Sequence, residues 1–205
     1  MEEKWEVKKL GEVLLKTENV NPVNKPDDEI DYVDVSSVSK STLAIESTQR
    51  IKGSEAPSRA RKLLRVNDVI FATIRPTLKR IAIVPQHLDG QVCSTGFMVL
   101  RAVPEVDFRF LFYFLQTESV LDEMAAKQKG ASYPAVTEAE VRSLPIPMPP
   151  PSTQRRIVGI LDEAFAGTAT AKANAEKNLE NARALFQSEL DAISRRREAG
   201  GRRNH

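Results

Sequence analysis

Basic side chains gather in one part of the sequence, residues 51–84, where they could bind phosphate groups. Eight lysines and arginines stand there against two acidic residues, a local net charge of +6, whereas the whole chain carries only +2. Cations fix the register of a protein on a phosphate backbone, and side-chain donors can also hydrogen-bond to base edges. A basic run is more often a solvated face, but this one coincides with predicted loops and strand ends. The candidates are Arg59, Arg61 and Lys62 in a predicted loop and Arg75, Thr77, Lys79 and Arg80 in a predicted hairpin turn.

A second candidate patch lies at the end of a predicted helix, residues 118–129. It comprises Lys127, Lys129, Ser132 and Tyr133. Together the two patches offer charge for phosphates and hydroxyl groups for base edges. Arg75 precedes Pro76 and could instead serve the fold of the hairpin, so that alternative stays open.

Residues for catalysis are missing from the sequence. No glycine-rich phosphate loop or dinucleotide fingerprint occurs, and the two histidines, His87 and His205, are isolated. The string nearest to an adenine methyltransferase motif, residues 148–151, lacks both its polar first residue and its aromatic last residue. Cys93 lies in a strand-like run and is interpreted as a small core residue. We therefore predict a binding protein with no catalytic residue, no metal site and no cofactor of its own.

Short strands are predicted to position the basic residues. Predicted strands occupy residues 30–35, 43–47, 68–74 and 81–84, residues 91–101 form a strand pair or a bent strand, and residues 52–65 form a loop. Helical patterns follow from Asp107 to Leu115 and over residues 118–129, and Thr137 caps a short helix. We predict an α+β fold: a mixed α/β domain with short strands, followed by one long coiled-coil helix.

The long helix is predicted over residues 151–198, after a proline-rich stop at residues 145–151. Its apolar and small residues recur at steps of three and four, with a 4-4 step around Ala175 that indicates a stutter. A single helix of this length cannot bury such a stripe. The expected interface residues are Ile157, Leu161, Ala164, Phe165, Ala175, Leu179, Ala182, Phe186, Leu190 and Ile193.

The partner of this helix is predicted to be a second copy of the chain or a different protein, because no second long helical pattern occurs. The alternative is that the helix folds back on its own domain. The 205 residues thus divide into a domain over 1–150, a helix over 151–198 and a disordered basic tail over 199–205. No segment has the length of a membrane span, no signal peptide is evident, and one cysteine fits a reducing cytoplasm.

Several short motifs, in order along nearly the whole chain, resemble those of specificity subunits of type I restriction–modification systems. The motifs are WEVKKLGEV at 5–13, DVIF at 68–71 followed by Arg75, STGFMVLR at 94–101, GASY at 130–133, VRSLPIPMPP at 141–150 and QRRIVGILD at 154–162. Each motif alone is weakly specific, and the order of all of them carries the resemblance.

The resemblance implies a target recognition domain that binds one short part of a split DNA sequence, and a helix that acts as a spacer and docks methyltransferase subunits. Full members of the family carry two such domains and two helices, whereas this chain has one of each. The implied assembly is an antiparallel homodimer on an interrupted palindrome in double-stranded DNA. Methyl transfer with S-adenosylmethionine, and cleavage by nuclease or translocase subunits, would belong to partners. The alternatives are a scaffold that does not bind DNA and a truncated fragment of a two-domain subunit.

Overall fold

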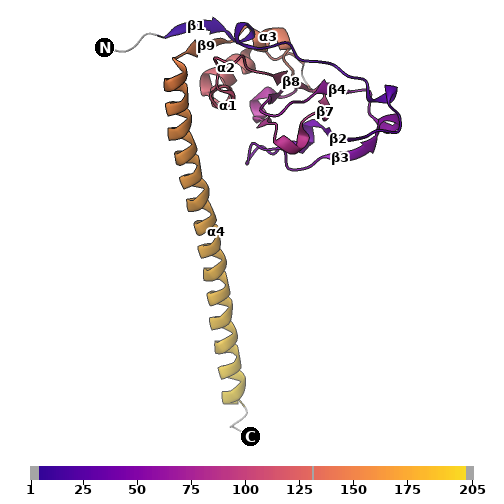
Figure 1. The fold of residues 1–205 in the computed structure, drawn as a ribbon. Coiled ribbons are helices and arrows are strands. Elements are labelled where there is room, and N and C mark those ends of the chain that lie inside the picture. Colours follow the sequence, from indigo (N-terminus) through magenta and orange to yellow (C-terminus); the bar gives the residue numbers. More distant parts are fainter. Residues whose placement is uncertain (1–4, 131, 202–205) are drawn as a thin grey trace. The chain divides into compact units, whose positions relative to one another are not determined.

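The computed structural model describes residues 5–130 and 132–201, without the side chains of residues 169, 189 and 191–201. The chain divides into two compact units, Met1–Val158 and Gly159–His205. The first unit contains all the strands of the described chain and three short helices, and the second contains most of the long helix α4 (Pro151–Gly201) (Figure 1). The fold class is α+β, as predicted.

Two sheets and a ribbon make up the strands of the first unit. A four-stranded sheet has the order β3-β2-β7-β4, with β2 and β7 parallel and the other neighbours antiparallel. A three-stranded antiparallel sheet has the order β6-β5-β8, and the N-terminal strand β1 pairs with β9. The strands are β1 (Glu6–Lys9), β2 (Glu29–Val33), β3 (Gln49–Lys52), β4 (Ala60–Leu63), β5 (Val69–Ala72), β6 (Ile81–Ile83), β7 (Val92–Ser94), β8 (Phe97–Leu100) and β9 (Pro145–Met148).

Three α-helices of the first unit and six 3₁₀ turns connect the strands. Asp107 Oδ1 accepts a hydrogen bond from the backbone N–H of Arg109 (2.8 Å) and caps the first α-helix. Thr137 caps the third, as predicted, with its Oγ1 accepting from the N–H of Glu140 (3.2 Å). The elements are α1 (Phe108–Phe114), α2 (Glu118–Lys127), α3 (Glu138–Arg142), η1 (Leu10–Val13), η2 (Pro22–Asn24), η3 (Val35–Ser37), η4 (Gly53–Glu55), η5 (Pro76–Leu78) and η6 (Gln86–Leu88).

Strand β5 is buried on both faces, and this explains its continuous apolar sequence. Val69 and Phe71 belong to one hydrophobic cluster together with residues of α1 and α2, whereas Ile70 and Ala72 belong to a second cluster. The alternation follows from the two-residue period of a strand. The hairpin of β5 and β6 is therefore fixed from two sides, and its connecting turn is held in a defined position.

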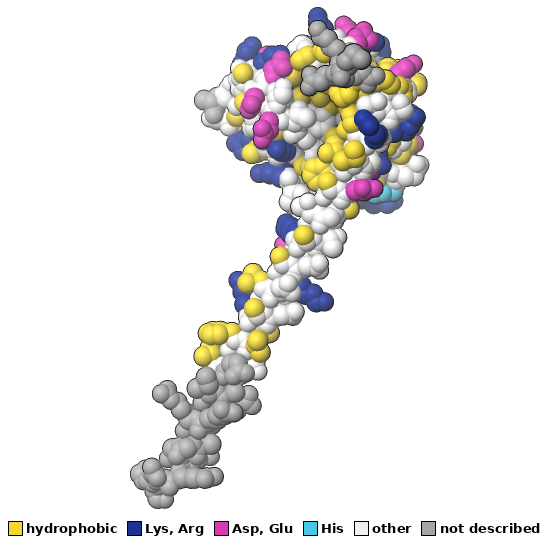
Figure 2. Space-filling view, turned by 90° about the vertical axis from the view of Figure 1, so that its left-hand side faces the viewer, with side chains coloured by type: hydrophobic (Ala, Val, Ile, Leu, Met, Phe, Trp, Pro, Cys, Tyr) yellow, Lys and Arg dark blue, Asp and Glu magenta, His cyan; other side chains and the backbone are white. Residues whose placement is uncertain are grey.

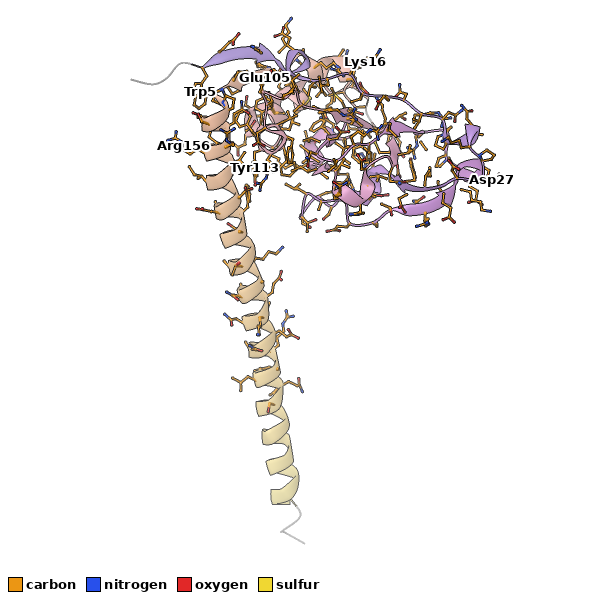
Figure 3. The ribbon with its side chains drawn as sticks, viewed as in Figure 1. Trp5, Lys16, Asp27, Glu105, Tyr113 and Arg156 are labelled. Carbon is orange, nitrogen blue, oxygen red and sulfur yellow. The ribbon has the colours of Figure 1, made fainter. Side chains whose placement is uncertain are left out.

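The start of α4 is joined to the first unit by the buried side chain of Gln154. Its Oε1 accepts from the N–H of Asp107 (2.9 Å), and its Nε2 donates to the carbonyls of Glu105 (3.1 Å) and Pro149 (3.0 Å). Val158 is buried and Ile157 packs against the same core. Figure 3 shows Trp5 and Glu105 near the first turns of this helix. The helix begins at Pro151, and its first two turns belong to the first unit.

The structure corrects four details of the predicted elements. Residues 52–65 are not one loop, because they contain η4 and β4. Residues 43–47 contribute only a single bridge, Val38 to Ile45, and β3 is the strand that pairs with β2. Residues 91–101 were predicted as a strand pair or a bent strand. Strands β7 and β8 lie in different sheets and do not pair with each other, so the bent strand is the nearer description. Helix α4 continues to Gly201, so residues 199–201 are helical, and 202–205 lie outside the described residues.

Cys93 is fully buried in β7, as predicted for a core residue, and burial raises the pKa of its thiol. A raised pKa leaves almost no thiolate at neutral pH. We expect the native chain not to react with a chromogenic disulfide reagent at pH 8, and to react with one equivalent after unfolding in urea. Rapid stoichiometric labelling of the native chain would contradict this expectation.

The described residues contain no helix that is both long enough and apolar enough to cross a lipid bilayer. Within the same residues, no group of three or more His, Cys, Asp or Glu side chains is arranged to hold a metal ion.

Candidate nucleic-acid interface

The hairpin turn between β5 and β6 carries two non-glycine residues in the left-handed conformation. Arg75 has φ 49° and Lys79 has φ 52°, and η5 lies between them. This conformation is unfavourable for residues with a Cβ, and non-glycine residues that adopt it occur often at functional sites. Both side chains are exposed, as is that of Thr77. The turn therefore presents two cations and a hydroxyl to solvent at the end of a rigid hairpin.

A segment more than fifty residues further along the chain lies directly against this turn. Ile74 and Lys129 each bridge to Ala135, and the N–H of Arg75 donates to the carbonyl of Pro134 (2.7 Å). Thr73 accepts from the N–H of Val136 (2.9 Å). Backbone hydrogen bonds thus join the hairpin turn to residues 129–136. The hairpin turn of the first candidate patch and the residues after α2 in the second patch therefore meet here.

Arg75 makes the side-chain contacts across this junction. Its Nη2 donates to the carbonyl of Ser132 (3.2 Å), and its guanidinium lies 5.4 Å from the centre of the Tyr133 ring. The guanidinium stacked on an aromatic ring is attracted to its negative face. Tyr133 remains 73% exposed, so most of its ring surface is free to contact another molecule. We call the residues Arg75, Thr77, Lys79, Lys129, Ser132 and Tyr133 the hairpin face.

Arg80 occupies a different position from the other hairpin cations. Its Nη1 donates to the carbonyls of Val35 (2.9 Å) and Val38 (2.6 Å), with a longer contact to that of Ser36 (3.4 Å). These carbonyls belong to η3 and the residue after it. Arg80 therefore holds segment 35–38 against the hairpin. Its guanidinium spends hydrogen-bond donors on backbone carbonyls of the protein itself, so fewer remain for another molecule. No local sequence pattern indicates this contact, because the two segments lie more than forty residues apart.

Arg59, Arg61 and Lys62 lie at or on β4 rather than in a loop, and they do not act as one group. Lys62 is half-buried and forms an ion pair with Glu138 of α3. Arg61 donates through Nη1 to the carbonyl of Ala60 (2.8 Å). Arg59 is exposed and pairs loosely with Asp34 (3.9 Å), which directly precedes η3. Arg59 and Arg80 thus both contact residues of segment 34–38.

The remaining two lysines of the second patch also differ. Lys127 donates to Glu123 (2.7 Å) and to the hydroxyl of Ser143 (3.1 Å), so its ammonium is directed toward α3. Lys129 is 86% exposed and lies 3.8 Å from Glu140. The pKa of the Glu140 carboxyl is lowered, chiefly by hydrogen bonds from the backbone and hydroxyl of Thr137. Lys129 is therefore the lysine of this patch that stays available on the hairpin face.

Taken together, the hairpin face can hold an anion and stack on a planar group. The ammonium group of Lys79 has no hydrogen-bond or ion-pair partner among the described residues, and the Arg75 guanidinium keeps donors that its contact with Ser132 does not use. Exposed cations beside an exposed aromatic ring are the combination with which proteins contact phosphates and bases.

A second surface, on α4, is apolar. Large hydrophobic side chains along this helix are exposed within the second unit (Figure 2): Ile160, Phe165, Leu179, Leu185, Phe186 and Leu190. The small expected interface residues Ala164, Ala175 and Ala182 are exposed as well, and Leu161 is half-buried. Ile157 packs against the core of the first unit, and the side chain of Ile193 lies outside the described residues.

Two of the sequence motifs have structural explanations. Asp68, which opens the DVIF motif, is 1% exposed and accepts from Arg101, the last residue of the STGFMVLR motif, at 2.8 Å and 2.9 Å. Gly96 in the latter motif has no room for a side chain, because a Cβ would lie 2.7 Å from a methyl carbon of Val35. The ion pair of Asp68 and Arg101 therefore joins the start of β5 to the end of β8. Gly96 leaves space for Val35 of segment 35–38 to lie against the turn between β7 and β8.

Comparison with known proteins gives one family. The model of the type I restriction modification DNA specificity domain matches residues 2–181. The chain is 29% identical over 110 residues to the type I restriction enzyme HindI specificity subunit of Haemophilus influenzae, and 26% identical over 122 residues to the EcoDI specificity subunit of Escherichia coli. These matches cover 52% and 60% of this chain but only 24% and 26% of the relatives. The chain thus matches about a quarter of the length of these curated relatives.

Solved structures show the same likeness. The HsdS subunit of Thermoanaerobacter tengcongensis is 43% identical with a TM-score of 0.77, covering 88% of this chain and 47% of that chain. A chain from a structural study of complex assembly and conformational transition of the type I R-M system is 40% identical with a TM-score of 0.84, covering 93% of this chain and 49% of that chain. The chain spans about half the length of these structures.

Proposed function

Because the chain belongs to the type I restriction modification DNA specificity family, we propose that it recognises a short sequence in double-stranded DNA through the hairpin face. The observation that carries this proposal is the junction of the hairpin turn with residues 129–136. It places the Arg75 guanidinium against the exposed ring of Tyr133, with Lys79 on the same turn and Lys129 on the segment that is hydrogen-bonded to it. Positioned donors of this kind can discriminate base edges, whereas mobile ones cannot.

Different residues of the face have different roles in this proposal. Lys79 and Lys129, as flexible point charges, contact phosphates and fix the register. Arg75, Thr77, Ser132 and Tyr133 contact the bases. Arg80 positions segment 35–38 beside the face and is not itself a contact. Arg59 contributes charge at the edge of the same segment.

The second part of the proposal concerns assembly. The exposed apolar side chains of α4 support pairing of this helix with a second copy of the chain in an antiparallel arrangement. Two-fold symmetry would then give an interrupted palindromic target, with the length of α4 setting the gap. Methyltransferase subunits dock on this dimer and supply the chemistry with S-adenosylmethionine, and nuclease or translocase subunits supply cleavage. The chain itself binds and does not catalyse.

A selection experiment tests the recognition of DNA. The purified chain, alone and with its methyltransferase subunit, is incubated with random-sequence duplexes at several salt concentrations, and the bound fraction is sequenced. We expect one short motif to be enriched and log K to fall linearly with log salt. Salt-dependent binding with no enriched motif would contradict sequence recognition, and absence of binding in both preparations would contradict the proposal as a whole.

A further inference from the structure

A short loop, residues 39–44, lies between η3 and β3 and has a fixed backbone shape. The residues that flank it, Val38 and Ile45, form an antiparallel bridge. Inside the loop, the N–H of Leu43 donates to the carbonyl of Ser39 (3.1 Å). Leu43 adopts the left-handed conformation (φ 52°), which is unfavourable for a residue with a Cβ, and its half-buried side chain packs against the hydrophobic cluster that includes residues of β5 and α1. We call this segment the 39–44 loop.

The start of the 39–44 loop is joined to the β5–β6 hairpin. The carbonyl of Val38, one residue before the loop, accepts from Nη1 of Arg80 (2.6 Å), which follows the hairpin turn. Ile74, which precedes the turn, and Val35 both lie against Gly96, because a Cβ at this glycine would be 3.5 Å from the first and 2.7 Å from the second. The segment that carries the loop is therefore held beside the residues that border the turn on both sides, next to the hairpin face.

The 39–44 loop presents three exposed polar side chains, those of Lys40, Ser41 and Thr42. The ammonium of Lys40 has no hydrogen-bond or ion-pair partner within the described part of the chain. The Oγ1 of Thr42 donates to Oε1 of Glu46 (2.7 Å), so its hydrogen is used and its remaining lone pairs can only accept. The Oγ of Ser41 lies 3.1 Å from that of Ser39, within hydrogen-bond distance. The loop thus offers a cation and a hydroxyl acceptor in fixed positions.

We propose that the 39–44 loop is a second DNA-contacting element, and that Arg80 is the residue that positions it. This inference rests on the proposed function and adds to it a specificity-determining residue, Thr42, outside the hairpin face. Thr42 accepts a hydrogen bond from the amino group of an adenine or a cytosine on the major-groove edge of the strand that it contacts. Guanine and thymine present acceptors at the same place and are disfavoured on that strand. Lys40 contacts a neighbouring phosphate.

Glu46 separates the roles of the two side chains. Its exposed carboxylate lies beside the Thr42 hydroxyl, so a phosphate at this point would be repelled, whereas a neutral base with an amino donor is not. Lys40 has no such carboxylate bonded to it and keeps its full charge for a phosphate. Thr42 is therefore the base contact and Lys40 the backbone contact. Lys40→Gln is expected to reduce the slope of log K against log salt by about 1.

Selection from random-sequence duplexes tests the contact of Thr42. Thr42→Val removes the hydroxyl and keeps the shape of the side chain. We expect it to lose the base preference at one position of the enriched motif, to keep the other positions, and to bind the target of the parent chain about tenfold more weakly. Thr42→Ser keeps the hydroxyl and is expected to retain the preference. Thr170→Val is the matched control, because Thr170 is also exposed and its hydroxyl also donates within the chain, to the carbonyl of Ala166 (3.0 Å).

Base analogues test the chemistry of this contact. Purine in place of adenine, or pyrimidin-2-one in place of cytosine, removes only the amino group at the affected position. We expect the parent chain to lose about tenfold in affinity for such a duplex. Thr42→Val should lose nothing further, because the hydrogen bond is already absent. An equal loss in both proteins would overturn the assignment of Thr42 as the acceptor.

A double-mutant cycle tests the role of Arg80. Arg80→Met removes the hydrogen bonds to the carbonyls of segment 35–38 and keeps the length of the side chain. If Arg80 acts through the loop, Arg80→Met loses the same base preference as Thr42→Val, and the double variant binds no more weakly than Arg80→Met alone. Additive losses would show a direct contact of Arg80 with DNA and overturn its positioning role. Thermal unfolding of each variant checks that the fold is kept.

The outcomes separate this inference from the proposed function. An unchanged motif and unchanged affinity of Thr42→Val would overturn the contact of the 39–44 loop and leave recognition by the hairpin face intact. A lost preference that Thr42→Ser does not retain would show an effect of packing and overturn the role of the hydroxyl. A parent chain that enriches no motif would contradict the proposed function, and this inference with it. Because Thr42 lies on the exposed loop, its variants test the contact even if Arg80→Met does not fold.

Discussion

The double variant Arg75→Glu/Lys79→Glu is expected to bind target DNA about a hundredfold more weakly than the parent chain at physiological salt. Both residues are exposed on the hairpin face, and the left-handed backbone holds them at the end of a rigid hairpin. Charge reversal removes two attractive contacts and adds repulsion from phosphates. Loss of the phosphate contact of Lys79 should also reduce the slope of log K against log salt by about 1.

Lys25→Glu is the matched control, because Lys25 is an exposed lysine of the same unit that pairs with Asp28 (3.6 Å), away from the hairpin face. It changes the net charge by the same amount per substitution. Arg80 is left intact in this design, since its bonds to three carbonyls would make any loss of binding ambiguous. Thermal unfolding of each variant checks that the fold is kept. Equal loss of affinity in Lys25→Glu would show a general charge effect and remove the hairpin face from the site.

The second large effect is on stability. Asp68→Asn is expected to lower the free energy of unfolding by about 3–5 kcal/mol, because it breaks a buried ion pair and leaves the guanidinium of Arg101 only its longer contact with the exposed Glu18 (3.5 Å). The Asp68 carboxylate also accepts from the N–H of Arg65 (2.8 Å), which fixes the chain before β5. Its hydrogen bonds raise the pKa of Arg101, the direction expected for a cation that gains a partner.

Urea unfolding measures this effect, with Glu29→Gln as the comparison. Glu29 and Arg50 also form a close ion pair (2.7 Å), but both side chains are more than half exposed, so water replaces the interaction and little stability is lost. If Asp68→Asn lowered the free energy of unfolding no more than Glu29→Gln does, the buried Asp68–Arg101 ion pair would not be important for the stability of the fold.

The sequence predicted those elements that depend only on a few neighbouring residues. The apolar run of β5, the turn at Pro76 and the returning β6 form a hairpin, and hairpins depend on adjacent residues. Thr137 as a cap and the start of α4 at Pro151 follow from the same kind of local chemistry. The coiled-coil spacing likewise indicates an apolar stripe along α4, and its role as an interface stays a prediction.

Other features depend on residues far apart in the sequence and could not be predicted. Strand β4 contains Arg61 and Lys62, which are untypical of a strand, and it exists because its backbone pairs with β7. The hairpin face needs residues 129–136 to bridge to Ile74, and no local pattern marks that contact. The different roles of Lys62 and Arg80 likewise appear only when Glu138 and the carbonyls of segment 35–38 are placed beside them.

The most direct test of this account is to map the DNA sites methylated by the chain together with its methyltransferase subunit, in cells or in purified form, by sequencing methylated bases. We expect one short sequence present twice in inverted orientation and separated by a fixed gap. A contiguous target, or two unrelated half-sites, would contradict recognition by a symmetric pair of these chains.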